Sequence, residues 1–162
     1  MRILAIDPGY DRLGVAIIEK LPKQKETVIF STCIQTDRAY PHQGRLATIA
    51  NEVRDIIKTW EPEAMAIESL FLATNQKTAM KVAEVRGALL VEATRAALVA
   101  YEYTPLQIKV AVTGYGKSDK KQVTEMVKKL VVIPELPQRR LDDEYDAIAI
   151  GLTCLASVKP IN

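Results

Sequence analysis

The chain opens with two apolar runs that are separated by a short turn. Residues 3–6 and 14–19 are largely apolar, and a Pro-Gly pair lies between them. A short apolar run bounded by turn residues is typical of a strand that is covered on both faces. The pattern predicts a hairpin, and a third strand follows at residues 27–35 after a polar turn at residues 21–26.

Beyond the hairpin, the apolar spacing alternates between the period of helices and that of strands. Apolar residues recur at intervals of three, four and seven over residues 46–60, which predicts an amphipathic helix. Residues 64–67 form a short apolar strand that ends at Glu68. The alanine-rich stretch from 78 to 100 has a helical pattern, and residues 101–103 are a candidate strand.

The last third of the chain is predicted to be mostly helical. Thr104 has the character of a helix N-cap, and Pro105 suits the first helical position, so a helix is expected as far as Val112. Two more helices are predicted at residues 119–130 and 141–158. Three strands followed by alternating helices and strands favour an α/β fold, with a mixed central sheet and helices on both faces.

The composition is that of an ordinary globular protein. Hydrophobic residues make up 48% and charged residues 26% of the 162 positions, a length that suits one domain over residues 1–162. No apolar stretch approaches the ~20 residues needed to cross a bilayer, and no signal peptide is recognised. Cys33 and Cys154 are expected to be reduced and buried, so we expect a cytoplasmic protein without membrane contact.

The charge is unevenly distributed. The net charge is only +2, but residues 105–140 carry eight basic and three acidic residues. A local excess of basic residues suits a polyanionic partner such as nucleic acid. A solvated lysine-rich helix face is the alternative interpretation.

Carboxylates stand at the ends of two predicted strands. Asp7 ends the first strand and Glu68 ends the strand at residues 64–67. If these strands are parallel neighbours, both side chains project at the same sheet edge, where ligand sites of open α/β sheets lie. Asp143 and Asp146 are three residues apart on the last predicted helix, so they share one face.

Carboxylates that are brought together repel one another, and a divalent cation removes that conflict. Sites made only of oxygen ligands suit Mg²⁺ or Mn²⁺. Two such ions ~3.5–4 Å apart can activate a water and stabilise the leaving oxygen of a phosphodiester. We therefore expect two Mg²⁺ ions, for which Mn²⁺ can substitute. The residues expected to bind them and to be catalytic are Asp7, Glu68, Asp143 and Asp146.

Other polar motifs have simpler interpretations. Asp142 and Glu144 are expected only to favour a helix N-terminus through its dipole. The segment Gly-Lys-Ser at 116–118 resembles the end of a phosphate-binding loop, but Ala111 replaces the first glycine and a predicted helix precedes it. The single histidine, His42, is interpreted as a solvated loop residue.

Taken together, several segments resemble the RuvC family of Holliday junction resolvases. They are AIDPG, GVAII, AIESLFLATN, AEVRGAL, TGYGKSDKKQV and DDEYDAIAIG, which occur in family order and cover nearly the whole chain. The resemblance implies an RNase H-like fold and a homodimer that uses Mg²⁺. Such enzymes nick two strands of a four-way DNA junction symmetrically, in homologous recombination and DNA repair. The resemblance also implies the RuvA–RuvB branch-migration complex as a partner.

The resemblance assigns roles to individual residues. Asp7 and Glu68 match the first two family carboxylates, and Asp143 and Asp146 match the pair on the last helix. Phe71 matches the aromatic residue that stacks at the open centre of the junction. The other candidate DNA contacts are Asn75, Lys77, Lys81, Lys109, Lys117, Lys120 and Lys121. Among the last four lysines, Lys109 and Lys120 match basic positions of the family best.

Some features of the family motifs stay open at the level of sequence. Gly87 is expected at a helix–helix contact, whereas Arg86 receives no role. The helix predicted at residues 78–100 is the candidate dimer surface, because its alanines permit close packing.

Three alternatives compete with this interpretation. A YqgF-like nuclease that acts on RNA shares the motif DRLGVA, but the FLATN loop and the basic GYGKSDKKQV segment speak against it. A sugar-kinase or actin-like ATPase needs two copies of the sheet, and 162 residues hold one. A catalytically silent junction-binding protein would not need all four acids.

Overall fold

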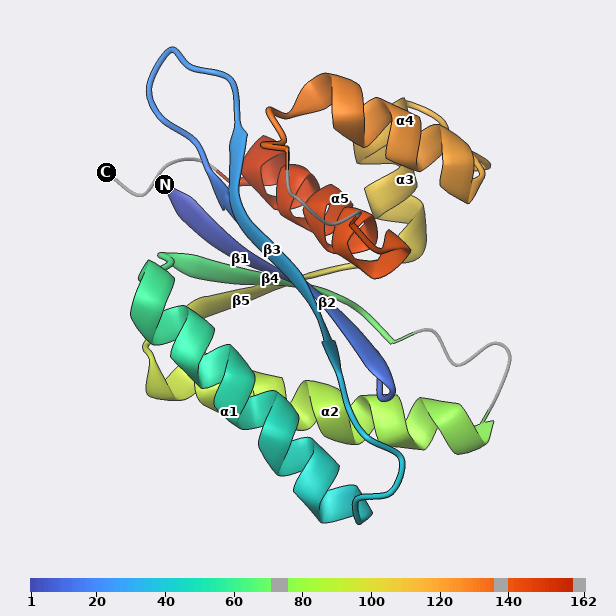
Figure 1. Cartoon of the computed structure of the whole chain (residues 1–162). Coiled ribbons are helices and arrows are strands. Elements are labelled where there is room, and N and C mark those ends of the chain that lie inside the picture. Colours follow the sequence, from blue (N-terminus) through green and yellow to red (C-terminus); the bar gives the residue numbers. More distant parts are fainter. Residues whose placement is uncertain (71–75, 136–139, 159–162) are drawn as a thin grey trace.

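A five-stranded mixed sheet forms the centre of the molecule (Figure 1). The computed structural model describes residues 1–70, 76–135 and 140–158. In chain order, the strands are β1 (Arg2–Asp7), β2 (Arg12–Glu19), β3 (Thr27–Gln35), β4 (Ala64–Glu68) and β5 (Val99–Tyr103). The spatial order is β3-β2-β1-β4-β5, in which β2 pairs antiparallel with β1 and β3, and β4 pairs parallel with β1 and β5.

Helices cover both faces of the sheet, as the sequence predicts. One face carries α1 (His42–Trp60) and α2 (Gln76–Arg95), while α3 (Pro105–Thr113), α4 (Lys120–Leu130) and α5 (Asp142–Ser157) lie over the other face (Figure 1). None of the helices in the described part of the chain has the length and apolarity needed to span a membrane. The α/β class with a mixed sheet between two helical layers is thereby confirmed.

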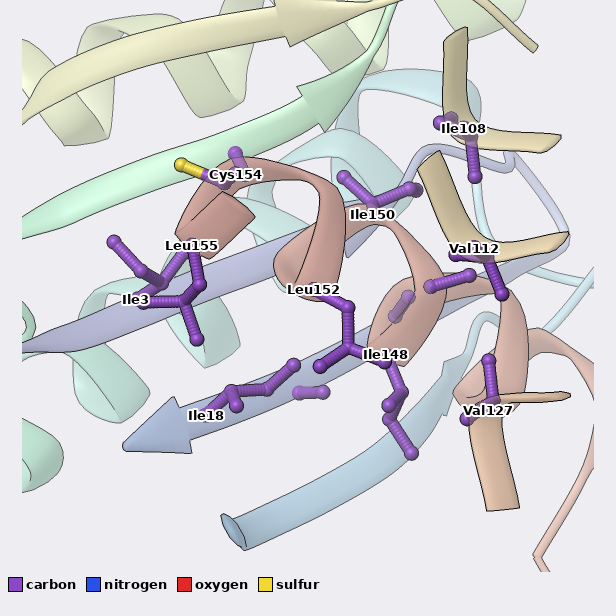
Figure 2. Packing of buried hydrophobic residues seen from close by; sticks show 14 of the residues in the cluster. Ile3, Ile18, Ile108, Val112, Val127, Ile148, Ile150, Leu152, Cys154 and Leu155 are labelled. Carbon is purple, nitrogen blue, oxygen red and sulfur yellow. The ribbon is translucent and has the colours of Figure 1, made fainter. Parts of the chain in front are cut away.

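The alternation of side chains along the strands produces two separate cores. Ile3 and Ile18 point toward α5, where they pack with Ile148, Leu152 and neighbouring apolar side chains (Figure 2). Leu4 belongs to the other core, beneath α1 and α2. Because both faces are covered, the central strands are continuously apolar.

Two glycines allow α5 to lie directly on the sheet. A Cβ at Gly151 would be 2.5 Å from Ile18 Cδ1 and 2.9 Å from the Cβ of Ala5, and a Cβ at Gly14 would overlap the backbone of Asp143. Gly14 is also the partner of Asp7 in the β1–β2 pairing. The first turn of α5 is therefore held beside the end of β1.

Capping boxes begin α3, which carries Lys109, and α4, which carries Lys120 and Lys121. Thr104 Oγ1 accepts a hydrogen bond from the backbone N–H of Gln107 at 3.2 Å, and Pro105 is the first helical residue, as predicted. Asp119 accepts in the same way from the N–H of Gln122 at 2.8 Å. Both caps satisfy backbone donors that a helix N-terminus leaves free.

The boundary between α2 and β5 differs from the prediction. The helix expected from 78 to 100 ends at Arg95, Ala97 takes a left-handed conformation with φ 55°, and β5 begins at Val99. Val99 and Ala100 pair in parallel with Ala64 and Met65 of β4. Apolar residues next to an alanine-rich helix fit either element locally, and the sheet pairing decides between them.

Candidate active site

Two predicted acids end neighbouring parallel strands. Ile6 of β1 pairs with Ile67 of β4, so Asp7 and Glu68 follow at the same edge of the sheet. Asp146, from the second turn of α5, joins them, and all three line one cavity of about 210 Å³. The sheet edge expected from the sequence is therefore the place where these carboxylates converge.

Burial and mutual repulsion dominate the electrostatics of the cavity. Desolvation, followed by the nearby carboxylates of Asp146, Glu68 and Asp143, raises the pKa of Asp7 to about 7. Desolvation and the charge of Asp146 also raise the pKa of Glu68. The pKa of Asp146 is raised by desolvation, which outweighs the lowering by Lys120. Holding these groups ionised together costs free energy unless positive charge is supplied.

Asp143 lies beside the cavity and does not line it. Its carboxylate accepts a hydrogen bond from the Arg12 guanidinium and lies 3.8 Å from the Cys33 thiol. The backbone contact with Gly14 places it there. Asp143 still contributes to the raised pKa of Asp7, so it belongs to the electrostatic environment of the site.

The donor set fits a hard divalent cation, because carboxylate oxygens at a partly buried site are the ligands that Mg²⁺ and Mn²⁺ prefer. As the side chains are placed, no three His, Cys, Asp or Glu residues within the described ranges form a ready-made ligand set. Lys120 and Arg12 instead bind Asp146 and Asp143. The site therefore collects negative charge at one point and balances part of it with basic side chains.

Two of the predicted phosphate contacts reach this cavity. Lys109 of α3 and Lys120 of α4 both line it, and Lys120 Nζ donates to Asp146 Oδ2 at 2.7 Å. Lys117 is exposed in the α3–α4 connection, and Lys121 borders a different hollow next to Tyr115. The structure thus separates Lys109 and Lys120, which matched the motif positions best, from Lys117 and Lys121.

The remaining candidate DNA contacts precede or begin α2. Phe71 and Asn75 lie outside the described residues, and Lys77 belongs to α2 by its backbone only. Lys81 is exposed on α2, and its Nζ lies 4.9 Å from the centroid of the Tyr10 ring.

Arg86, to which the sequence assigned no role, contacts the backbone of a proposed site residue. Its side chain is buried, Nη1 donates to the backbone carbonyl of Glu68 at 2.9 Å, and Nη2 donates to Glu102 Oε2 at 2.8 Å. It therefore fastens the end of β4 to β5 and α2. The only signal in the sequence was an arginine beside Val85 on the apolar stripe of α2.

The expected packing role of Gly87 is wrong within this chain, because a Cβ there would meet nothing within 4 Å.

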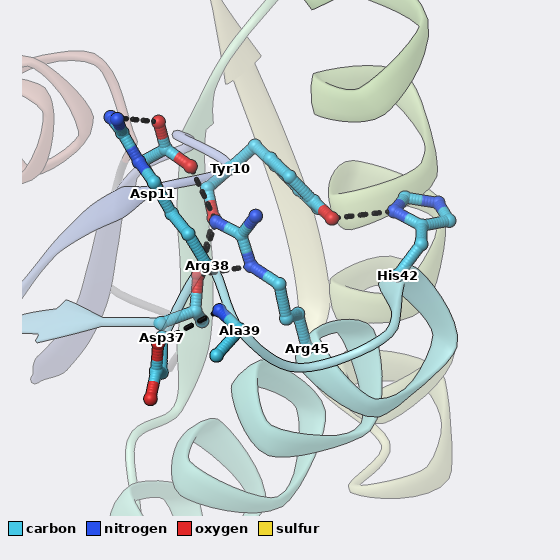
Figure 3. Close-up of polar contacts among 8 residues, drawn as sticks. Tyr10, Asp11, Asp37, Arg38, Ala39, His42 and Arg45 are labelled. Carbon is cyan, nitrogen blue, oxygen red and sulfur yellow. Dashed lines mark hydrogen bonds and ion pairs between the residues drawn. The ribbon is translucent and has the colours of Figure 1, made fainter.

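His42 is not the solvated loop residue that the sequence suggested. It is the first residue of α1, and its Nδ1 lies 2.8 Å from the Tyr10 hydroxyl (Figure 3). Its Nε2 lies 2.5 Å from Glu84 Oε2. A lone histidine next to Pro41 gives no local sign of such partners. It joins the β1–β2 turn to both α1 and α2, away from the carboxylate cavity.

The acids that begin α5 differ in role. Asp142 is exposed, as expected for a residue that only favours the helix N-terminus. Glu144 is buried and accepts hydrogen bonds from the Ser31 hydroxyl at 2.5 Å and the Leu141 backbone N–H at 3.0 Å. Its role is therefore more than the predicted dipole interaction, because it attaches α5 to β3.

The 116–118 segment follows a helix, as predicted, which argues against a phosphate-binding loop.

Comparison with known sequences shows close relatives over the full chain. A family model described as crossover junction endodeoxyribonuclease RuvC matches residues 3–154. The protein of that name from Thermosipho melanesiensis is 44% identical over 156 residues, which are 96% of this chain and 97% of the relative. The one from Desulfitobacterium hafniense is 40% identical over 162 residues, or 100% and 96% of the two chains.

Solved structures agree with these matches. The structure of T. thermophilus RuvC in complex with Holliday junction substrate has a TM-score of 0.86 at 32% identity, covering 94% of this chain and 92% of that one. The yeast mitochondrial Holliday junction resolvase Ydc2 has a TM-score of 0.71 at 12% identity over 94% and 76% of the chains, a likeness of fold alone.

The fold and the site therefore define the class of the protein, which is a metal-dependent nuclease with an RNase H-like fold. Within this class, the chain belongs to the crossover junction endodeoxyribonuclease RuvC family. The family and the fold that the sequence motifs suggested are both confirmed.

Proposed function

We propose that this protein resolves four-way DNA junctions by paired, symmetric cleavage of two phosphodiester bonds. One observation carries the proposal: three acids and two lysines from five different elements converge on a single cavity at the ends of β1 and β4. A relative in the same family was solved with a Holliday junction substrate, which supports this substrate.

Asp7, Glu68, Asp143 and Asp146 are the residues proposed to hold two Mg²⁺ ions, with Mn²⁺ able to replace them. When bound, such ions lower the pKa of a water and stabilise the charge of the leaving oxygen. The raised pKa values of Asp7, Glu68 and Asp146 support this assignment, because a cation would relieve the repulsion that raises them.

The chain's own residues position the substrate and the acids. Lys109 and Lys120 would hold the phosphate near the carboxylates, and Lys120 would exchange its bond to Asp146 for one to the DNA. Arg86 holds the backbone of Glu68, and Arg12 holds Asp143. Contacts with phosphate oxygens orient the strand without reading its sequence.

Paired cuts in a symmetric junction require two active sites, so we propose that the protein acts as a homodimer. The exposed face of α2 supports this, because Met80 and Val91 are exposed to 70% and 49% and flank the small residue Gly87. Family membership further supports the RuvA–RuvB branch-migration complex as a partner and a cytoplasmic location.

The test is the cleavage of a synthetic four-way junction in Mg²⁺, compared with a linear duplex and with RNA. We expect paired nicks in the junction alone. Preferential cleavage of RNA would instead support a YqgF-like activity, and binding without cleavage would support a silent junction-binding protein.

Changing Asp7 to Asn keeps the shape of the side chain and removes the charge at the centre of the site. Nicking should fall by orders of magnitude while junction binding in Ca²⁺ persists. Asp142→Asn is the matched control and should be nearly silent, because Asp142 is exposed outside the cavity. Near wild-type cleavage by Asp7→Asn in Mg²⁺ would refute the proposed metal site.

A further inference from the structure

A second basic pocket lies on the other side of the β1–β2 turn from Lys109 and Lys120. It has a volume of about 490 Å³ and is formed by the β1–β2 turn, the segment between β3 and α1, and the start of both α1 and α2. Among the described residues, four cations and a single carboxylate line it. Its charged residues are Asp11, Arg12, Arg38, Arg45 and Lys81.

Two of these cations pack on one aromatic ring. The Arg45 guanidinium lies 3.8 Å and Lys81 Nζ 4.9 Å from the centroid of the Tyr10 ring. The side chain of Arg45 is buried, and its Nε and Nη2 bond to Thr36, Asp11 and the Tyr10 carbonyl (Figure 3). Within the described residues Nη1 has no hydrogen-bond partner, so it can donate into the pocket that Arg45 lines.

Protein carboxylates balance only part of this charge, since Arg12 is paired with Asp143 outside the pocket. Asp11 is the only acid among the described lining residues, and it is shared between Arg45 and Arg38, the latter at 2.8 Å. Glu84 of α2 is bonded to His42 and does not line the pocket. Like charges held on one ring repel each other, and an anion between them relieves the repulsion. Guanidinium forks beside an ammonium suit a phosphate oxygen pair.

The pocket lies beside the carboxylate site. Arg12 lines it and also donates to Asp143, and Gly9 of its rim is two residues from Asp7. The carboxylates therefore lie between two basic groups, with Lys109 and Lys120 on the α3–α4 side and this pocket on the α1–α2 side. A DNA strand whose scissile phosphate sits at the acids would pass over both.

We propose that this pocket binds a phosphate of the strand that is cut, on the side of the scissile phosphate opposite to Lys109 and Lys120. The inference rests on the proposed junction cleavage and adds a subsite that holds the strand from both directions. Lys81 and Arg38 make the accessible contacts, whereas buried Arg45 forms the floor of the pocket.

The test compares Lys81→Ala, Arg38→Ala and the double variant with Lys58→Ala, which removes an exposed lysine at the far end of α1. Junction binding is titrated with salt in Ca²⁺, where cleavage is not required. The slope of log K against log salt should fall by about 0.9 for each phosphate that the protein no longer neutralises. Lys58→Ala should leave it unchanged.

A second arm places single neutral methylphosphonates on either side of the scissile phosphate. A methylphosphonate at one position should weaken junction binding by the wild type several-fold and have no effect on binding by the double variant. Methylphosphonates on the Lys109 side should weaken binding by both proteins alike. An unchanged salt slope in the double variant, or equal sensitivity to every methylphosphonate, would overturn the subsite while leaving junction binding intact. Failure of the wild-type protein to prefer a junction would overturn the proposed function and the subsite with it.

Discussion

At the scale of the residue, Asp7 lies at the centre of the proposed site, in a position where its charged form destabilises the folded protein. Its pKa is raised from 3.8 to about 7, first by burial and then by three other carboxylates. Between these two values the folded state binds a proton that the unfolded chain releases. The free energy of unfolding therefore falls as the pH rises through this window.

This shift predicts a pH-dependent effect of Asp7→Asn in EDTA. The variant should be more stable than the wild type at pH 8, by an amount on the order of a few kcal/mol, and the difference should vanish near pH 4. Urea unfolding at several pH values measures it. If the variant were destabilised equally at every pH, the ionised Asp7 carboxylate would not lower the free energy of unfolding of the wild type.

Arg86 is the residue whose removal should separate metal use from DNA binding. Arg86→Gln leaves the Glu68 carbonyl without its donor, which costs about 1–3 kcal/mol of stability. It should also raise the Mg²⁺ concentration that gives half-maximal nicking, while junction affinity in Ca²⁺ stays the same.

Glu102→Gln is the matched control for Arg86. It weakens the ion pair with Arg86 but keeps the hydrogen bond to Glu68. The Mg²⁺ requirement should therefore change little. An equal shift in both variants would mean that the ion pair, and not the bond to Glu68, positions the acid.

At the scale of the element, α5 reaches the site because glycine lets it lie on the sheet. Gly151→Ala should lower the free energy of unfolding by about 1–2 kcal/mol, since the new Cβ would crowd Ala5 and Ile18. Gly44→Ala in α1 is the matched control, because its Cβ would meet nothing within 4 Å. That variant should be neutral or up to about 1 kcal/mol more stable.

Thermal or urea unfolding of the two glycine variants compares the same chemical change in two helices. Gly151→Ala should in addition weaken nicking, because α5 carries Asp143 and Asp146. Stabilisation by both substitutions would show that the contact between α5 and the sheet is looser than described.

At the scale of the whole molecule, the two basic groups around the acids should determine the salt dependence of binding. Lys120→Ala should reduce the slope of log K against log salt by about 0.9, and Lys120→Glu should weaken binding further through repulsion. The preferred cleavage position should stay the same, because phosphate contacts carry no base information. A salt titration in Ca²⁺ measures the slope. A slope equal to that of the wild type in both variants would place Lys120 away from the DNA.

Features that depend on a few neighbouring residues could be predicted from the sequence. The apolar period located β1, β2 and α1, and the Thr104-Pro105 pair located the start of α3. An acid directly after each of two apolar strands was enough to place Asp7 and Glu68 at strand ends. Such signals are local because side-chain period and capping involve contacts within a few residues.

Contacts between distant residues depend on how the helices and strands pack in the folded molecule. Val99 and Ala100 pair with β4 and form a strand, although a helix was predicted there. The packing of α2 places Arg86 next to the Glu68 carbonyl. Two of four similar lysines reach the acids because α3 and α4 fold over that end of the sheet, and Arg45 and Lys81 share one tyrosine. These contacts join residues far apart in the chain, so they are set by the packing of whole elements and leave no periodic signal in the sequence.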